Sequence, residues 1–115
     1  MMVAVIDKQT YGYDIEKNEW QNLNSEIPFK ASDSSSVFAW DTAAGRFIVA
    51  NINEGRIAVL DMEGHKWDEI KPNGPGIPKA QYGTGKGYYD PLYNVLVIQR
   101  SSSDKMWVYR HAAGQ

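Results

Sequence analysis

The residues of this chain that could do chemistry are few and scattered. The two histidines, His65 and His111, do not share the HxH or HxxxH spacing that would make a metal site. The serine runs at 34–36 and 101–103 lack the glycine-flanked elbow of an activated nucleophile. The segment GTGKG at 83–87 departs from the GxxxxGK[ST] spacing of a phosphate loop. The sequence therefore predicts no catalytic residue, no metal site and no cofactor.

Four aspartates recur at matched places along the chain. Asp14 and Asp61 each precede a tryptophan by six residues, and Asp41 and Asp90 each follow an aromatic residue directly. Catalytic residues normally break the symmetry of a repeat, whereas these four preserve it. The pattern favours a structural task, such as accepting hydrogen bonds from turn amides.

The composition sets limits on partners and location. The 115 residues carry a net charge of −2 and contain no cysteine, so no disulfide or thiolate site is possible. Such a charge provides no field to attract nucleic acid or an anionic membrane, and no nucleic-acid or membrane partner is expected. The opening MMVAVIDKQT lacks the features of a signal peptide, and no apolar run is long enough to span a bilayer. A soluble protein of undetermined compartment is predicted.

The elements that position these residues belong to an internal repeat. A shift of 47 places Asp14 on Asp61 and Trp20 on Trp67. A shift of 49 aligns residues 30–62 with residues 79–111 without a gap, and apolar, turn and charged positions keep their class. Looking for such self-similarity first matters, because a missed repeat misassigns the whole fold.

Each period contains four short strands separated by turns. Their β-branched and aromatic content is typical of hairpins. In the complete unit Gly45, Gly55 and Gly64 lie at the three turns, where a positive φ is often required. The predicted strands are Ser35–Thr42, Arg46–Ile52, Arg56–Met62 and Lys66–Ile70.

Four antiparallel strands in a period of 40 to 50 residues are typical of a propeller blade. The predicted fold class is all-β, with antiparallel four-stranded blades forming a partial β-propeller. A β-sandwich is the alternative, although it would not explain a gapless internal match. The repeated aromatic residues are expected in the core between blades: Trp20, Trp40, Trp67, Tyr89 and Trp107.

The sequence resembles the kelch and galactose-oxidase-like propeller repeats. Their third and fourth strands carry a tyrosine–aspartate pair followed by a short turn and a tryptophan, as in Tyr13-Asp14 and Trp20 here. The paired glycines that this family has after the second strand are replaced by Asn51-Ile52-Asn53 and Arg100-Ser101-Ser102. The resemblance implies a divergent propeller and no particular activity, because such propellers include enzymes and scaffolds.

The repeat divides the single domain 1–115 into an incomplete blade at 1–29, a complete blade at 30–78 and an incomplete blade at 79–115. With strands lettered a to d from the inside outward, the order is bcd, abcd, abc. Unpaired strand edges invite pairing with another chain. We therefore expect self-association as a homodimer, with a fragment of a longer reading frame as the alternative.

The two longest connections are predicted at Asn22–Ser34 and Lys71–Gln81. Ligand binding is expected where these connections and the b–c turns share one face of the blades, because variable loops on a rigid scaffold often carry binding sites. The expected function is a non-catalytic binding or assembly module for a protein or carbohydrate ligand. The alternatives are part of a carbohydrate-active or oxidase-like enzyme and a purely structural oligomer. The candidate ligand-binding residues are Lys30, Asp33, Asn53, Glu54, Lys79, Tyr82 and Arg100.

Overall fold

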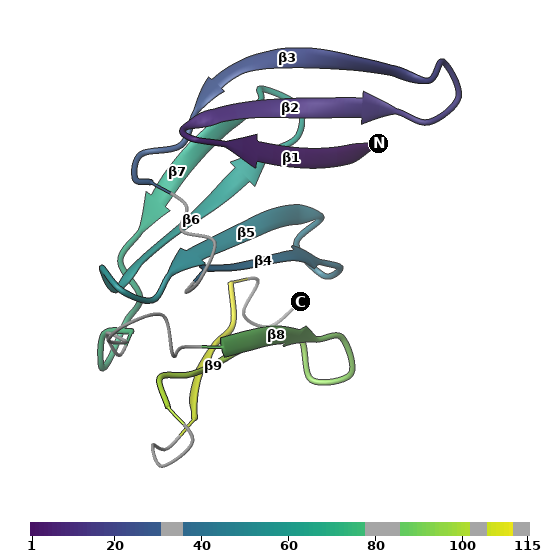
Figure 1. Ribbon diagram of the computed structural model, residues 1–115. Helices are drawn as coiled ribbons and strands as arrows, with labels where there is room; N and C mark the ends of the chain where they lie inside the picture. The colour runs from purple at the N-terminus through teal and green to yellow at the C-terminus, as the bar shows by residue number, and fades with distance from the viewer. Residues whose placement is uncertain (31–35, 78–85, 102–105, 112–115) are drawn as a thin grey trace.

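The computed structural model describes residues 1–30, 36–77, 86–101 and 106–111 of the chain. These residues form three small antiparallel sheets of three, four and three strands, stacked as layers (Figure 1). The all-β prediction is confirmed. None of the described residues form a helix that could cross a membrane.

The strand order follows the chain within every sheet, since each neighbouring pair is a hairpin. The first sheet holds β1 (Met2–Ile6), β2 (Gln9–Asp14) and β3 (Glu19–Glu26). The second holds β4 (Ser36–Asp41), β5 (Arg46–Asn51), β6 (Arg56–Asp61) and β7 (Lys66–Ile70). The third holds β8 (Lys86–Asp90), β9 (Val95–Gln99) and β10 (Trp107–Tyr109).

The strand register confirms the internal repeat. Val49 lies opposite Ala58 in the second sheet, and the residues 49 positions later, Ile98 and Trp107, lie opposite each other in the third. The shift of 47 holds as well, because Tyr13 faces Trp20 in the first sheet as Leu60 faces Trp67 in the second. The same residue positions therefore meet in successive sheets.

Five hairpins share one turn design. An Asp or Asn ends the first strand, four residues follow, and the last of these four has a positive φ. Gly45 and Gly55 take that last position, as predicted. Gly64 lies in the β6–β7 turn as predicted, but the positive φ of that turn, 53°, belongs to His65. The turn places its left-handed residue just before the second strand, one position after Gly64.

The repeated aspartates accept hydrogen bonds from turn amides, as predicted. Asp14 Oδ1 accepts from the Glu16 and Lys17 amides at 3.0 and 3.1 Å. Asp41 Oδ1 does the same with Ala43 and Ala44 at 3.0 and 2.9 Å. Matching bonds hold the turns after Asp61 and Asp90. Short carboxylates close these turns because they reach their own backbone two and three residues on.

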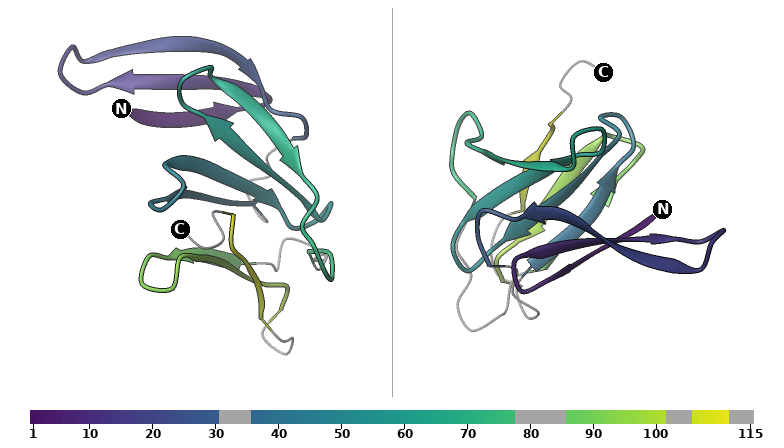
Figure 2. Two further views of the ribbon diagram at one scale, coloured as in Figure 1. Left: turned by 180° about the vertical axis from the view of Figure 1, so that it is seen from behind. Right: turned by 90° about the horizontal axis from the view of Figure 1, so that it is seen from above.

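Two apolar clusters fill the spaces between the sheets. The larger lies between the second and third sheets, where Ile48, Ile57 and Val59 meet Leu96 and Ile98. The smaller lies between the first and second sheets and contains Ile27, Phe29, Val49 and Ala58, with Val5 packed against it. Each sheet of the stack is therefore joined to its neighbour by buried side chains, and the view from behind shows the same layers (Figure 2).

The repeated aromatic residues differ in burial, which corrects part of the prediction. Trp67 and Trp107 pack against the two clusters, while Trp20 and Trp40 are exposed. Trp40 lies on the face of the second sheet that is turned toward the first sheet. Among the described residues the first sheet has three strands, and none of them covers Trp40. Trp20 lies on the face of the first sheet that points away from the stack. Both lack a neighbouring layer, so neither is part of a core in this chain.

The first long connection also starts later than predicted. A loop is expected from Asn22, but β3 continues to Glu26. A register irregularity between Gln9 and Tyr11 and a positive φ of 54° at Asn24 allow the strand to pass this point. The Ile27 amide then donates to the Lys8 carbonyl at 2.9 Å, which directs the chain toward the second sheet.

Candidate functional site

Three of the predicted ligand-binding residues lie on one side of the second sheet. Lys30 is exposed on the connection that follows β3, and Asn53 and Glu54 are exposed in the β5–β6 turn. Arg100 is exposed directly after β9 in the third sheet. Asp33, Lys79 and Tyr82 fall outside the described residues. The structure therefore brings the Lys30 connection and the Glu54 turn together, through residues that the prediction did not name.

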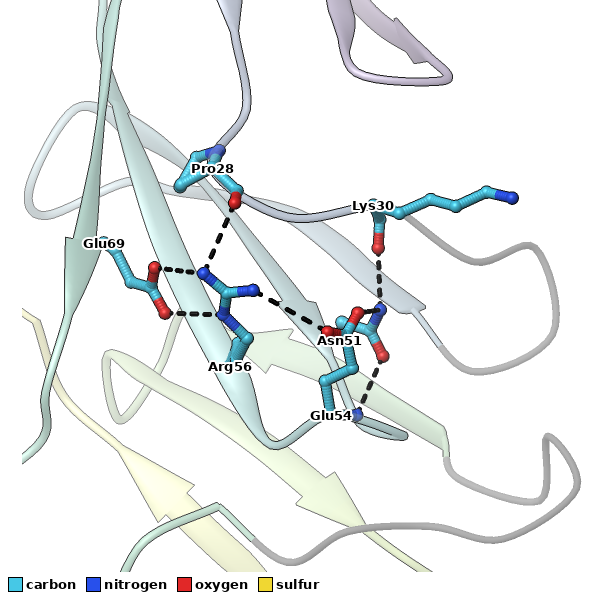
Figure 3. Close-up of polar contacts among 6 residues, drawn as sticks. All are labelled: Pro28, Lys30, Asn51, Glu54, Arg56 and Glu69. Carbon is cyan, nitrogen blue, oxygen red and sulfur yellow. Dashed lines mark hydrogen bonds and ion pairs between the residues drawn. The ribbon is translucent and has the colours of Figure 1, made fainter.

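Asn51 joins the connection to the turn. Its Nδ2 donates to the Lys30 carbonyl oxygen at 2.7 Å and to Glu54 Oε2 at 2.9 Å, and its Oδ1 accepts from the Glu54 amide at 3.1 Å (Figure 3). Asn51 is buried, so these bonds satisfy its amide group. The Lys30 contribution is a backbone carbonyl, which any residue type would supply.

Arg56 is the charged centre of the same side of the sheet. Its Nε donates to Glu69 Oε2 at 2.8 Å and its Nη2 to Glu69 Oε1 at 2.6 Å, a bidentate pair (Figure 3). Nη2 also reaches the Pro28 carbonyl oxygen at 3.3 Å, and Nη1 lies 3.7 Å from Glu54 Oε1. The guanidinium carbon sits 5.1 Å from the centre of the Phe29 ring.

Arg56 and Glu69 each stabilise the charged form of the other. The hydrogen bond from Arg56 holds the pKa of the Glu69 carboxyl below its usual value, and the hydrogen bond to Glu69 raises the pKa of Arg56. All three guanidinium nitrogens of Arg56 are engaged within the chain, as are both carboxylate oxygens of Glu54. The predicted face therefore fastens the connection after β3 to the second sheet, and the charges of Arg56, Glu54 and Glu69 are paired with one another.

A groove of about 520 Å³ lies elsewhere, between the end of the second sheet and β10. One wall is the end of β7 with the connection that follows it, and the other is a run of six consecutive residues around β10. Consecutive strand residues point to alternate faces, so a groove lined by all of them runs along the strand edge. Its lining residues are Ile70, Lys71, Pro72, Asn73, Pro75, Met106, Trp107, Val108, Tyr109, Arg110 and His111.

An aromatic row stands along this groove. The Trp107 and Tyr109 rings stack with centroids 6.0 Å apart and planes 7° apart, and the Tyr109 hydroxyl is 2.8 Å from His111 Nδ1. Trp107 Nε1 donates to the Pro75 carbonyl oxygen at 3.0 Å, which ties the two walls together. Burial raises the pKa of Tyr109, and the charge of Asp41 raises it further. The phenol is therefore a neutral hydrogen-bonding group at physiological pH.

β10 is also an edge strand. Among the described strands it pairs only with β9, so its outer side faces the groove. In the second sheet the matching strand, β6, pairs on that side with β7. Within the described residues no group of three His, Asp or Glu side chains could hold a metal ion. Within the described part of the chain, the groove thus presents a strand edge that no other strand pairs with, together with aromatic rings.

The sequence contained one signal for this groove, the replacement of Ala58 by Trp107 at the matched position of the repeat. Its position beside a strand edge was not readable from the sequence, because it depends on how β10 lies against the segment after β7. No protein-family model and no curated protein sequence matches the chain.

Proposed function

We propose that this chain is a non-catalytic binding and assembly module made of β-propeller blades of the kelch-like kind. This proposal is supported by the contacts between strands that hold the same place in successive sheets. β4 and β8, the first strands of their blades, lie together, and so do β3 and β7, the last strands. Blades arranged around an axis have this relation, because inner strands crowd together and outer strands follow the rim.

The ligand in this proposal is an extended peptide that adds a strand to β10. The observation that carries it is the groove beside the outer edge of β10, in the place that β7 occupies next to β6. Strand addition obtains affinity from backbone hydrogen bonds and specificity from pockets for alternate side chains. The stacked Trp107 and Tyr109 rings supply an apolar wall for those side chains.

The chain itself contains a suitable probe, namely the strand β7 with its flanking residues. A labelled synthetic peptide of residues 62–72 should bind to the full chain, as measured by fluorescence anisotropy. The same peptide methylated at alternate backbone nitrogens is the control, and it should lose binding because it cannot donate to a strand edge. A Val108→Pro substitution, which removes a backbone donor from β10, should weaken binding of the unmodified peptide.

Two results would contradict the proposal. One is equal binding of the methylated and unmodified peptides, which would show that the strand edge is not used. The other is the absence of peptide binding combined with binding of a glycan on an array that Trp107→Ala abolishes. That second result would make the aromatic row a carbohydrate platform.

A further inference from the structure

The outer face of the first sheet carries large exposed apolar side chains. Thr10 and Val5 point toward the second sheet, since Thr10 contacts Trp67 and Val5 packs against the smaller apolar cluster between the two sheets. Strand alternation therefore turns Ile6 and Tyr13 to the opposite face, and Trp20 joins them because it lies opposite Tyr13. Ile6 and Trp20 are 61% and 58% exposed.

The outer face of the third sheet has the same character. Trp107 and Tyr109 point toward the second sheet, so Val108 between them points away. Val108 lies in one cross-strand row with Val97 and Tyr88. Val108, Tyr88 and the adjacent Met106 are each more than half exposed. Val97 between them is only 6% exposed, so the apolar surface of this face is supplied by Val108, Tyr88 and Met106. Large apolar side chains that gather on one exposed face favour an interaction site.

The repeat shows what each face packs against inside the molecule. Trp20 corresponds to Trp67, which lies against the first sheet and donates to Thr10. Val108 corresponds to Val59, which is 2% exposed because the third sheet covers it. Inside the molecule, the face of a sheet that carries Trp67 packs against the next sheet, and so does the face that carries Val59. At the ends of the stack the matching faces, which carry Trp20 and Val108, are exposed.

We propose that the Trp20 face of one copy packs against the Val108 face of a second copy, head to tail. This inference rests on the proposed propeller arrangement. Following the shifts of 47 and 49, Thr10 corresponds to Ile57 and then to Met106. The Trp20 indole of one copy thus lies on the partner copy's Met106, a contact between a thioether and an aromatic ring.

Two copies joined in this way make two equivalent contacts. A heterologous contact gives a closed ring when its rotation closes and an open filament when it does not. Two copies would bring together six complete or incomplete blades. Met106 and Val108 also line the β10 groove, so peptide binding and self-association are each measured on the wild-type chain by a separate experiment.

The test is the mass of the full chain in solution, measured by light scattering after size-exclusion chromatography. The wild type should be a dimer. Trp20→Glu and Val108→Glu should each raise the dimer dissociation constant by about 100-fold or more, because the new carboxylate would be buried without a partner. Leu92→Glu is the matched control, since Leu92 lies in the β8–β9 turn and is 81% exposed. It should remain a dimer.

Mixing the two disrupted variants separates a head-to-tail contact from a symmetric one. In a 1:1 pair the intact Trp20 face of the Val108→Glu chain meets the intact Val108 face of the Trp20→Glu chain, while the other contact carries both new carboxylates. The mixture should therefore associate more tightly than either variant alone, through its one intact contact. A monomeric wild type, a dimeric Trp20→Glu variant or a mixture that associates no more tightly than the separate variants would each overturn the inference, while binding of the 62–72 peptide would still test the proposed function. Circular dichroism of each variant verifies its fold.

Discussion

The Trp67 indole Nε1 donates a hydrogen bond of 2.8 Å to the Thr10 hydroxyl, 57 positions away in the chain. The donor lies on β7 in the second sheet and the acceptor on β2 in the first. Thr10 is 0% exposed, so water cannot replace the bond. The pair shows how an aromatic residue of one sheet is anchored on the next.

Replacing Thr10 by Val keeps the shape of the side chain and removes this acceptor. We expect the free energy of unfolding to fall by about 1–3 kcal/mol, because the indole N–H is left without a partner. Urea unfolding followed by circular dichroism measures the change. In a Trp67→Phe background the same substitution should cost almost nothing, and an equal loss in both backgrounds would mean that the bond is not the cause.

The aspartates at matched turns should not contribute equally to stability. Asp41 is 1% exposed and also accepts from the Tyr89 hydroxyl at 3.0 Å, which joins the second sheet to the third. Asp14 bonds turn amides at a more exposed site. We expect Asp41→Ala to cost about 2–3 kcal/mol and Asp14→Ala about 1 kcal/mol, measured by urea unfolding. Similar losses would assign no role to the Tyr89 contact.

The Arg56–Glu69 pair predicts a loss of stability in acid. Because the pKa of Glu69 is lower in the folded chain, the pair contributes fully above the usual carboxyl value of 4.5. The contribution declines as the pH falls through the lowered value. In Glu69→Gln the melting temperature should change less between pH 5 and about pH 3 than in the wild type.

The control for this acid effect is Glu63→Gln in the β6–β7 turn, which leaves the Arg56–Glu69 pair in place. Its melting profile should keep the acid decline of the wild type. If Glu69→Gln and Glu63→Gln gave the same profile, the decline would belong to other carboxylates of the chain.

Gly87 is predicted to be intolerant of any side chain. A Cβ at this position would lie 2.6 Å from the Val97 carbonyl oxygen and 2.7 Å from Val37 Cγ2. We expect Gly87→Ala to cost about 1–3 kcal/mol through the displacement of β8 from β4. Gly76→Ala is the control, because nothing lies within 4 Å of its Cβ and the loss of unfolded-chain freedom should leave stability equal or slightly higher. Thermal unfolding distinguishes the two variants.

Among the candidate ligand-binding residues, Lys30 and Glu54 both contact Asn51, which donates to the Lys30 carbonyl and to the Glu54 carboxylate. A role of these residues in ligand binding stays a prediction. The prediction did not name Arg56 and Glu69, which belong to adjacent strands and pair only because β6 and β7 set their register. Arg56 and Glu69 neutralise each other in the folded chain, whereas from the sequence alone both charges look available to a ligand.

The sequence by itself determined the four strands of the complete unit to within a residue at their ends, and the aspartates that close its turns, because both depend on residues close together in the chain. It did not place the end of β3 or the positive φ of the β6–β7 turn. Only the tertiary structure decided which repeated aromatic residues are covered. Trp20 and Trp67 occupy one position of the repeat, yet only Trp67 has a sheet against it. Burial depends on the neighbouring layer, which a position within the repeat does not specify.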